Sequence, residues 1–123
     1  MMINVKDEVY AALCTVTENV TDHYPNTWEQ DVTIQYMEED NKVADETTRG
    51  ESKSYVRYRI DIWSIKNTSP IAVSVDAAIS PLGLKRIQCM DVEDPSGMKH
   101  KQMRYEGIID VSSRRVYHAI GKD

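Results

Sequence analysis

The sequence predicts an α+β fold in which an antiparallel-rich sheet carries two helices on one face. Two segments have apolar residues every three to four positions, which is typical of helices with one buried stripe. Four other segments alternate apolar and polar residues, as strands with one buried face do. The order is α-β-β-α-β-β, and 123 residues without an evident linker predict a single domain over residues 1–123.

The first helix is predicted from Val5 to Val20. Asn4 is a suitable N-cap, because its side-chain oxygen can accept a hydrogen bond from a backbone N–H of the first turn. The segment from Thr21 to Thr27 contains Pro25 and small polar residues, so we expect the helix to have ended there. The apolar stripe consists of Val5, Val9, Ala12, Leu13, Val16 and Val20.

Two strands are predicted next, at Val32–Asp40 and Lys53–Ile65. The polar segment Asp40–Ser52 between them has no apolar period, so it is either a long loop or the tip of a projecting hairpin. In the second strand, Tyr55 and Trp63 fall on the polar face. If exposed, these aromatic side chains fit an interface; the alternative is that they pack on the second helix or on a loop.

The second half of the chain begins with a helix that Thr68 or Ser69 caps and that ends near Gly83. An Asp-Pro-Ser-Gly sequence then predicts a type I turn between two strands. The predicted elements are a helix at Ser69–Leu82, a strand at Leu84–Val92, the turn at Asp94–Gly97, a strand at Met98–Val111 and a short last strand including Val116 and Tyr117.

Charge is distributed unevenly along the chain. The net charge of −5 disfavours a protein that coats nucleic acid, which would ordinarily be basic. Residues 1–62 hold 13 acidic and 6 basic residues, whereas residues 63–123 hold 7 acidic and 9 basic ones. Two copies of such a chain can make contacts between opposite charges.

We expect no signal peptide, because Lys6, Asp7 and Glu8 interrupt the segment from Met1 to Leu13. We also expect no membrane span, because no apolar run approaches the roughly 20 residues that cross a bilayer. Synthesis in a reducing cytoplasm predicts that the two cysteines, Cys14 and Cys89, are buried free thiols.

Residues for catalysis or metal binding form no recognisable pattern. There is no glycine-rich phosphate loop and no GxSxG motif. The three histidines, His23, His100 and His118, have no metal-ligand spacing. We therefore expect no catalytic residues, no metal and no cofactor. An acid–base or ligand-binding fold would need a buried carboxylate or histidine, for which Asp61 and Asp76 are the candidate carboxylates.

Four motifs together give the chain a family resemblance. They are Tyr-Pro-x-x-Trp at Tyr24–Trp28, Asp-Ile-Trp-Ser at Asp61–Ser64, the helix at Ser69–Leu82 closing on Gly-Leu-Lys-Arg, and the segment Asp94–Asp110. In this order they resemble the small tail terminator, or tail completion, proteins of long-tailed phages and prophages of Gram-positive bacteria. The resemblance covers nearly the whole chain and rests on scattered residues rather than on a catalytic signature.

This resemblance implies a structural protein without enzymatic activity. Its copies would form a ring, commonly a hexamer, at the head-proximal end of the tail tube. The ring would stop tube polymerisation and join the tail to head-completion, or connector, proteins. DNA would pass through its lumen without specific binding, and the protein would be assembled in the bacterial cytoplasm into the neck of the virion.

Three other functions remain open. One is a head-completion protein of the same neck, one is the small ligand-binding or acid–base fold described above, and one is an acidic, toxin-neutralising type of binding protein.

Two surfaces are candidates for assembly. Burial under the apolar face cannot explain the acidic segment, because that face ends at Tyr36; we therefore expect these acids to line the lumen or the joining surface. The acidic residues are Glu38, Glu39, Asp40, Asp45, Glu46 and Glu51. The residues expected at the subunit interface are Tyr55, Arg57, Arg59, Trp63, Lys99, Lys101 and Arg104.

Overall fold

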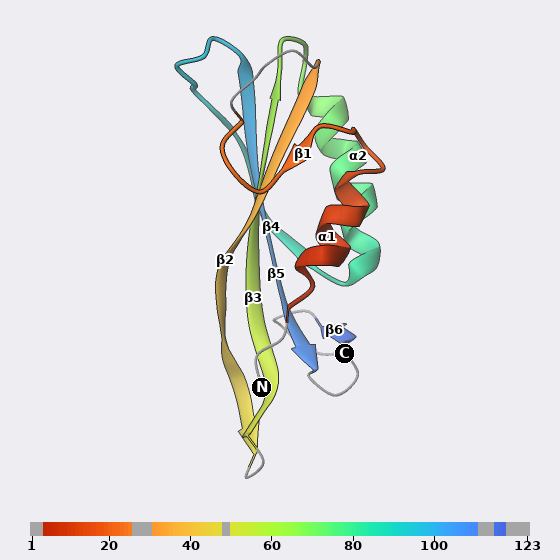
Figure 1. The fold of residues 1–123 in the computed structure, drawn as a ribbon, viewed down its shortest axis with the longest axis vertical. Coiled ribbons are helices and arrows are strands. Elements are labelled where there is room, and N and C mark those ends of the chain that lie inside the picture. The colour runs from red at the N-terminus through yellow and green to blue at the C-terminus, as the bar shows by residue number, and fades with distance from the viewer. Residues whose placement is uncertain (1–3, 26–30, 48–49, 111–114, 118–123) are drawn as a thin grey trace.

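The computed structural model describes residues 4–25, 31–47, 50–110 and 115–117. The predicted α+β class is confirmed: six strands form one sheet, and both helices lie on the same side of it (Figure 1). The elements are α1 (Lys6–Leu13), β1 (Val20–Thr21), β2 (Val32–Thr47), β3 (Gly50–Ser64), α2 (Ser69–Ile79), a 3₁₀ turn (Ser80–Leu82), β4 (Lys85–Val92), β5 (Lys99–Asp110) and β6 (Arg115–Tyr117).

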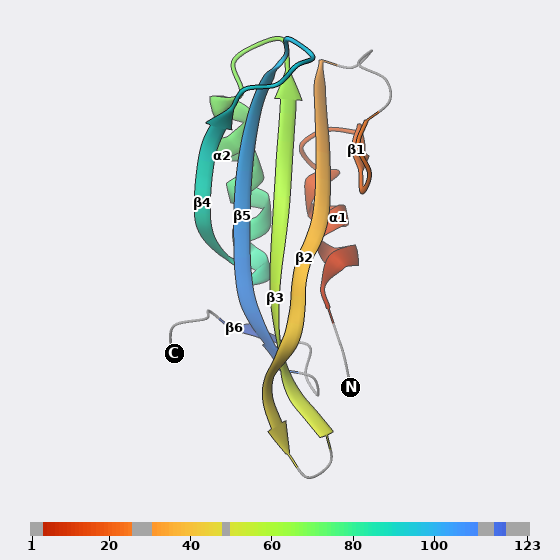
Figure 2. The same ribbon diagram turned by 90° about the vertical axis from the view of Figure 1, so that its left-hand side faces the viewer.

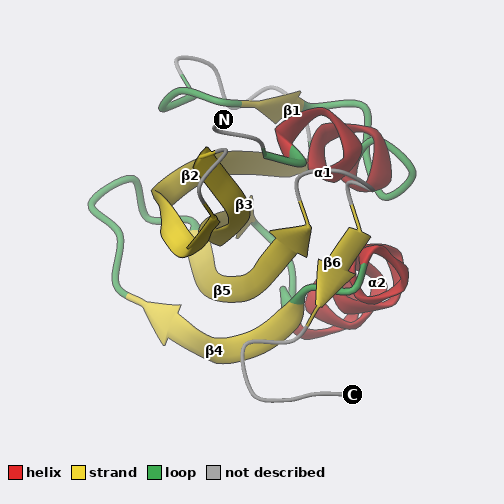
Figure 3. Ribbon diagram, turned by 90° about the horizontal axis from the view of Figure 1, so that it is seen from below, coloured by secondary structure: helices red, strands yellow, loops and turns green. Residues whose placement is uncertain are grey.

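The strands lie in the order β1-β2-β3-β5-β4, with β6 pairing to β5. Every pairing is antiparallel except that of the two-residue β1 with β2. Figure 2 shows β4 and α2 at one side of the molecule and α1 with β1 at the other. Seen along the strands, the sheet is strongly curved (Figure 3).

The first helix is shorter than predicted. It ends at Leu13, and the expected continuation to Val20 is wrong, because the run Thr15-Val16-Thr17 is β-branched and leaves the helix in tight turns. The side-chain hydroxyl of Thr15 donates to the carbonyl of Ala12 at 2.6 Å, which competes with helix continuation. Val20 instead pairs with Ile34 as part of β1.

Strands β2 and β3 form one long hairpin. Their register runs from Val32 opposite Ser64 to Thr47 opposite Gly50, so the segment after Asp40 is the tip of a projecting hairpin rather than a loop. Its end reaches well beyond the two helices (Figures 1 and 2). Irregular pairing at Glu39 and Ala44 interrupts the alternation of β2, which is why the sequence pattern ends too early.

The core lies between the helices and one face of the sheet. Tyr58 and Tyr105 are fully buried in it, and both hydroxyl groups are hydrogen-bonded to distant parts of the chain. The backbone N–H of Val5 donates to the Tyr58 hydroxyl at 3.1 Å, and the Tyr105 hydroxyl donates to Asp76 Oδ1 at 2.7 Å. These bonds attach α1 to β3 and β5 to α2. The most buried aliphatic members are Val9, Leu13, Ile34, Val56, Ile60, Ile62, Val75, Ile79 and Ile109.

Both cysteines are exposed, so the prediction of buried thiols is wrong. Cys14 lies just after the last turn of α1, and Cys89 lies on β4, the edge strand of the sheet. Neither helix in the described part of the chain is long and apolar enough to cross a membrane.

Candidate assembly surface

The sheet face away from the helices, here called the open face, carries a polar side-chain network. Because Val56, Tyr58, Ile60 and Ile62 of β3 pack toward the helices, the residues between them point the other way. The register of β3 with β5 then brings further polar residues beside them. The open face consists of Glu39 from β2, Tyr55, Arg57, Arg59, Asp61 and Trp63 from β3, Gln88 from β4, and His100, Gln102, Arg104 and Glu106 from β5.

Glu39 is the centre of an arginine cluster. It is the extra residue of a β-bulge between Glu38 and Asp40. Its Oε1 accepts hydrogen bonds from Arg57 Nε at 3.1 Å and Arg104 Nε at 2.9 Å, and its Oε2 accepts one from Arg104 Nη2 at 3.1 Å.

A third arginine completes this cluster. Arg59 Nη1 lies 3.7 Å from Glu39 Oε2, and the Glu39 side chain is only 14% exposed. Partial burial alone would raise the Glu39 pKa, but hydrogen bonds and positive charge from Arg104 and Arg57 outweigh it and lower the pKa. Arg104 also donates to Gln88 and Gln102. The cluster therefore links β2, β3, β5 and β4 across the sheet.

A second cluster surrounds Asp61, which is 2% exposed. Its Oδ1 lies 2.7 Å from Nε2 of His100 and accepts a hydrogen bond from Gln102 Nε2 at 3.1 Å. Its Oδ2 accepts a hydrogen bond from Arg59 Nε at 2.8 Å. Because Arg59 also faces Glu39, the two clusters form one continuous network. This buried carboxylate is therefore fully engaged by donors of its own chain.

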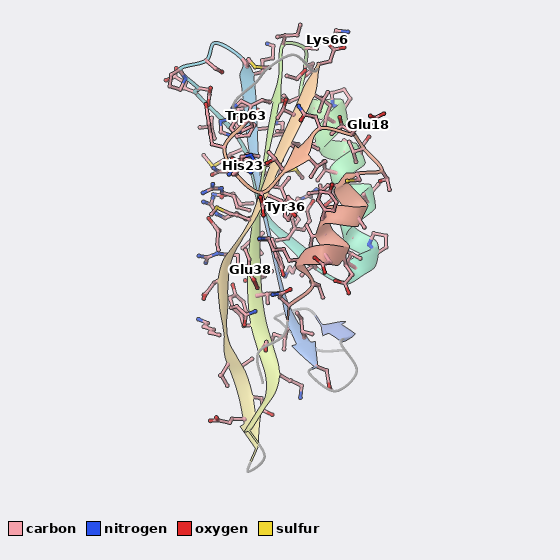
Figure 4. The ribbon with its side chains drawn as sticks, viewed as in Figure 1. Glu18, His23, Tyr36, Glu38, Trp63 and Lys66 are labelled. Atoms are coloured by element: carbon pink, nitrogen blue, oxygen red, sulfur yellow. The ribbon has the colours of Figure 1, made fainter. Side chains whose placement is uncertain are left out.

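Trp63 is buried, with 2% exposure, so the expectation of an exposed aromatic at this position is wrong. The alternative, packing on a loop, is the one observed. Its indole ring stacks on His100 with centroids 4.4 Å apart, and Tyr24 contacts it edge-on at 5.7 Å. Its indole N–H donates to Asp94 Oδ1 at 3.1 Å, in the turn before β5. Figure 4 shows Trp63 on the side of the sheet away from the helices.

The Asp94 side chain fastens this turn to the sheet. Burial would raise its pKa, but hydrogen bonds from Ser96 and Trp63 and the nearby His100 lower it. The backbone N–H of Gly97 donates to the Asp94 carbonyl at 3.2 Å, as expected for the predicted turn. His100 Nδ1 lies 3.4 Å from Asp94 Oδ1, so the imidazole sits between two carboxylates.

Five of the seven residues expected at an interface lie on the open face, and two do not. Lys101 points to the opposite face, where its ammonium group pairs with Asp91 Oδ1 at 2.8 Å, and Lys99 is exposed at the start of β5. Tyr55 donates its hydroxyl proton to Glu106 Oε1 at 2.7 Å, and Lys42 lies over its ring. The five on the open face are Tyr55, Arg57, Arg59, Trp63 and Arg104.

The six acidic residues do not form one group. Glu39 belongs to the arginine cluster of the open face, where ion pairs within the chain, and not burial under the apolar face, account for it. Glu38 lies along β2 toward the hairpin tip (Figure 4) and accepts a hydrogen bond from Asn41 Nδ2 at 2.8 Å. Asp45 and Glu46 are exposed near the tip. The side chain of Glu51 lies outside the described residues.

The two candidate acid–base carboxylates are both engaged. Asp61 is described above, and Asp76 accepts the Tyr105 hydrogen bond and lies 3.3 Å from Arg86. Within the described ranges, no group of three His, Cys, Asp or Glu side chains is placed to hold a metal ion. His23 is exposed beside Asp22, and His118 lies outside the described residues. Sequence reasoning missed the role of His100, because that role depends on the residues opposite it in β3.

Comparisons with known proteins relate the fold to a virion. No protein-family model matches the sequence, and curated proteins give no significant match. Among solved structures, a chain of "Virion of native gene transfer agent (GTA) particle" superposes with a TM-score of 0.52 at 14% identity. The match covers 80% of this chain and 88% of that one. The two chains therefore share their fold.

Proposed function

We propose that this protein is a structural component of a phage-like virion and, within it, the tail terminator. The likeness of fold to a chain from a gene transfer agent virion supports the virion role, since it extends over most of both chains. The resemblance of the four sequence motifs to tail terminators supports the finer assignment. Its partners would be further copies of itself in a ring, the tail tube protein and a head-completion protein.

The side-chain network of the open face suits a subunit whose sheet must be rigid. Glu39 and Asp61 tie four neighbouring strands together through charge-assisted hydrogen bonds, which are stronger than neutral ones. A satisfied buried network of this kind rigidifies the sheet. We infer that this network stabilises the fold of the individual subunit. Contacts with neighbouring copies would then also involve surfaces outside the network.

The projecting hairpin is suited either to bind a partner protein or to line the channel through which DNA passes. It projects beyond the helices, and its distal part carries Asp45 and Glu46 in exposed positions (Figure 1). Carboxylates repeated around a ring would repel the phosphates of passing DNA and so prevent it from sticking. The same charges would attract a basic surface on a neck protein. Either role accounts for charged residues on a ribbon that has no helix beneath it.

Deletion of the gene in a phage or prophage that encodes this protein tests the proposal. A tail terminator is required to stop tube growth, so we expect tails of uncontrolled length that do not join to heads. Complementation with the wild-type gene restores normal tails. Tails of normal length that fail to join to heads would assign the protein to head completion instead. Normal, infectious particles would overturn both neck functions.

A further inference from the structure

His100 is a buried histidine that lies between two carboxylates. Its ring is 9% exposed, and the side chains of Asp61 and Asp94 are 3% and 8% exposed. Its Nε2 lies 2.7 Å from Asp61 Oδ1, and its Nδ1 lies 3.4 Å from Asp94 Oδ1. Within the described residues, Nδ1 makes no hydrogen bond to any other group. Each nitrogen of the ring therefore faces an acceptor.

A neutral imidazole cannot satisfy both of these contacts. A carboxylate only accepts hydrogen bonds, so the 2.7 Å contact with Asp61 needs a proton on Nε2. In a neutral ring Nδ1 would then carry a lone pair, and this lone pair would face the carboxylate of Asp94 in a buried site. An imidazolium has a proton on each nitrogen, so it donates to Asp61 and attracts Asp94 at the same time. The geometry therefore favours the charged ring.

The charged groups around the ring are unevenly placed. Both groups that contact it are carboxylates, and β4 places an uncharged residue opposite it. Arg59 donates to the far oxygen of Asp61 rather than facing the ring. Lys101 points to the opposite face of the sheet, where it pairs with Asp91. The titratable and charged groups on these elements are Arg59 and Asp61 from β3, Asp91 from β4, Glu93 and Asp94 from the turn that follows, and Lys99 and Lys101 from β5.

Asp94 belongs to the turn between β4 and β5. It accepts hydrogen bonds from Trp63 Nε1 at 3.1 Å and from the backbone N–H of Ser96 at 3.0 Å. The turn lies at the end of the sheet opposite to the tip of the β2–β3 hairpin (Figure 1). His100 therefore connects the sheet to the turn that packs against Trp63.

We propose that His100 is a proton-dependent latch for the turn between β4 and β5. As an imidazolium it links Asp61 in β3 to Asp94 in the turn, and loss of its proton removes the attraction to Asp94 and loosens the turn. Because Trp63 bonds to Asp94 and stacks on the same ring, loosening of the turn exposes Trp63. The latch is a property of the single subunit, so it does not depend on the proposed role in the tail.

The direction of the pH dependence follows from these charges. Burial alone would raise the Asp94 pKa, but hydrogen bonds from Ser96 and Trp63 and the charge of His100 lower it below its ordinary value of 3.8. Asp94 therefore stays ionised in mildly acidic solution. The latch is closed at mildly acidic pH, and it opens as the pH rises and the His100 ring loses its proton.

Nuclear magnetic resonance of isotope-labelled histidine provides the first test. The His100 signals are those missing from His100→Gln, and their titration gives the pH at which the ring loses its proton. Asp94→Asn keeps the shape of the side chain and removes its charge, so we expect this midpoint to fall by about one pH unit. The matched control is Glu93→Gln, an exposed change in the same turn, which should shift the midpoint by less than about 0.3 units. Equal midpoints in the wild type and Asp94→Asn would overturn the proposal.

The second test follows the turn itself. In a Trp28→Phe background Trp63 is the one remaining tryptophan of the sequence, and quenching of its fluorescence by acrylamide measures its accessibility. We expect quenching to increase at least about twofold as the His100 ring loses its proton, with an unchanged far-UV circular dichroism spectrum. This step should move to lower pH in Asp94→Asn and stay in place in Glu93→Gln. Quenching that is constant across the His100 titration, or that rises only when the circular dichroism signal is lost, would contradict the latch.

Discussion

Trp63 and His100 lie directly opposite each other on β3 and β5, and their rings stack at 4.4 Å with an angle of 22° between the planes. The pair closes one end of the open face. Through Asp94 and Tyr24 it also holds two loops against the sheet. In the sequence, Trp63 resembles an exposed aromatic residue of an interface. In the fold it is buried, and residues from two loops pack around it.

Replacement of Trp63 by Ala should destabilise the protein strongly. Loss of a buried tryptophan costs about 3–5 kcal/mol in the free energy of unfolding, because the cavity is only partly refilled. Urea denaturation followed by circular dichroism measures the change. Tyr24→Ala, which removes an exposed ring from the same contact, should cost about 1 kcal/mol. Similar costs for the two variants would contradict the central position of Trp63.

His100 should not tolerate replacement by Ala, unlike His23. Removal of the imidazole leaves buried Asp61 without one of its partners, which costs about 2–3 kcal/mol. His23→Ala should lie within about 0.5 kcal/mol of the wild type, because its ring is exposed. Thermal melts of the two variants, side by side, provide the measurement. Equal melting temperatures would show that the contact between Asp61 and His100 contributes nothing to stability.

Glu39 should make stability depend on pH in the acid range. Its folded pKa is below its ordinary value of 4.5, so its contribution is complete above that value and is lost as the pH falls through the folded pKa. Glu39→Gln should cost about 1–3 kcal/mol at pH 7, since three arginines lose their anionic partner.

Below the folded pKa, the difference between Glu39→Gln and the wild type should disappear. The control is Glu46→Gln, an exposed change near the hairpin tip, which should stay within about 0.5 kcal/mol of wild type throughout. The midpoint of denaturant-induced unfolding, measured across the acid pH range, distinguishes the two variants. A Glu39→Gln deficit that persists at the lowest pH would show that its charge is not the cause.

The remaining hairpin acids should matter for assembly rather than for folding. Changing Glu38, Asp40, Asp45, Glu46 and Glu51 to amides, with Glu39 kept, should leave the circular dichroism spectrum unchanged. The charge that repels DNA or attracts a neck partner is lost, so we expect fewer joined particles in infected cells. Fully infectious particles from this variant would show that these acidic residues have no role in assembly.

Much of the fold could be predicted from local patterns. Val5, Val9 and Leu13 recur at helical spacing and are buried as expected, and the alternation in β3 assigns its two faces correctly. The bulge at Glu39 could not be predicted, because it displaces the alternation without any marker such as glycine or proline.

The network on the open face depends on long-range register. Alternation places Asp61 on the polar face, yet it says nothing of whether that position is buried. Burial arises because His100 and Gln102 lie opposite on β5, 39 and 41 residues away along the chain, and because the Asp94 turn folds over them. Exposure of Cys14 and Cys89 likewise depends on which elements lie at the edge of the fold.

The most direct test of the tail-terminator proposal is electron cryomicroscopy of intact tails from a phage or prophage that encodes this protein. We expect a closed ring at the head-proximal end of the tube, with density in each subunit that fits the curved sheet, its two helices and the projecting hairpin. The tail-terminator proposal would be contradicted if the head-proximal end of the tube carried no ring of this fold. The protein would then lie elsewhere in the particle or be absent from it.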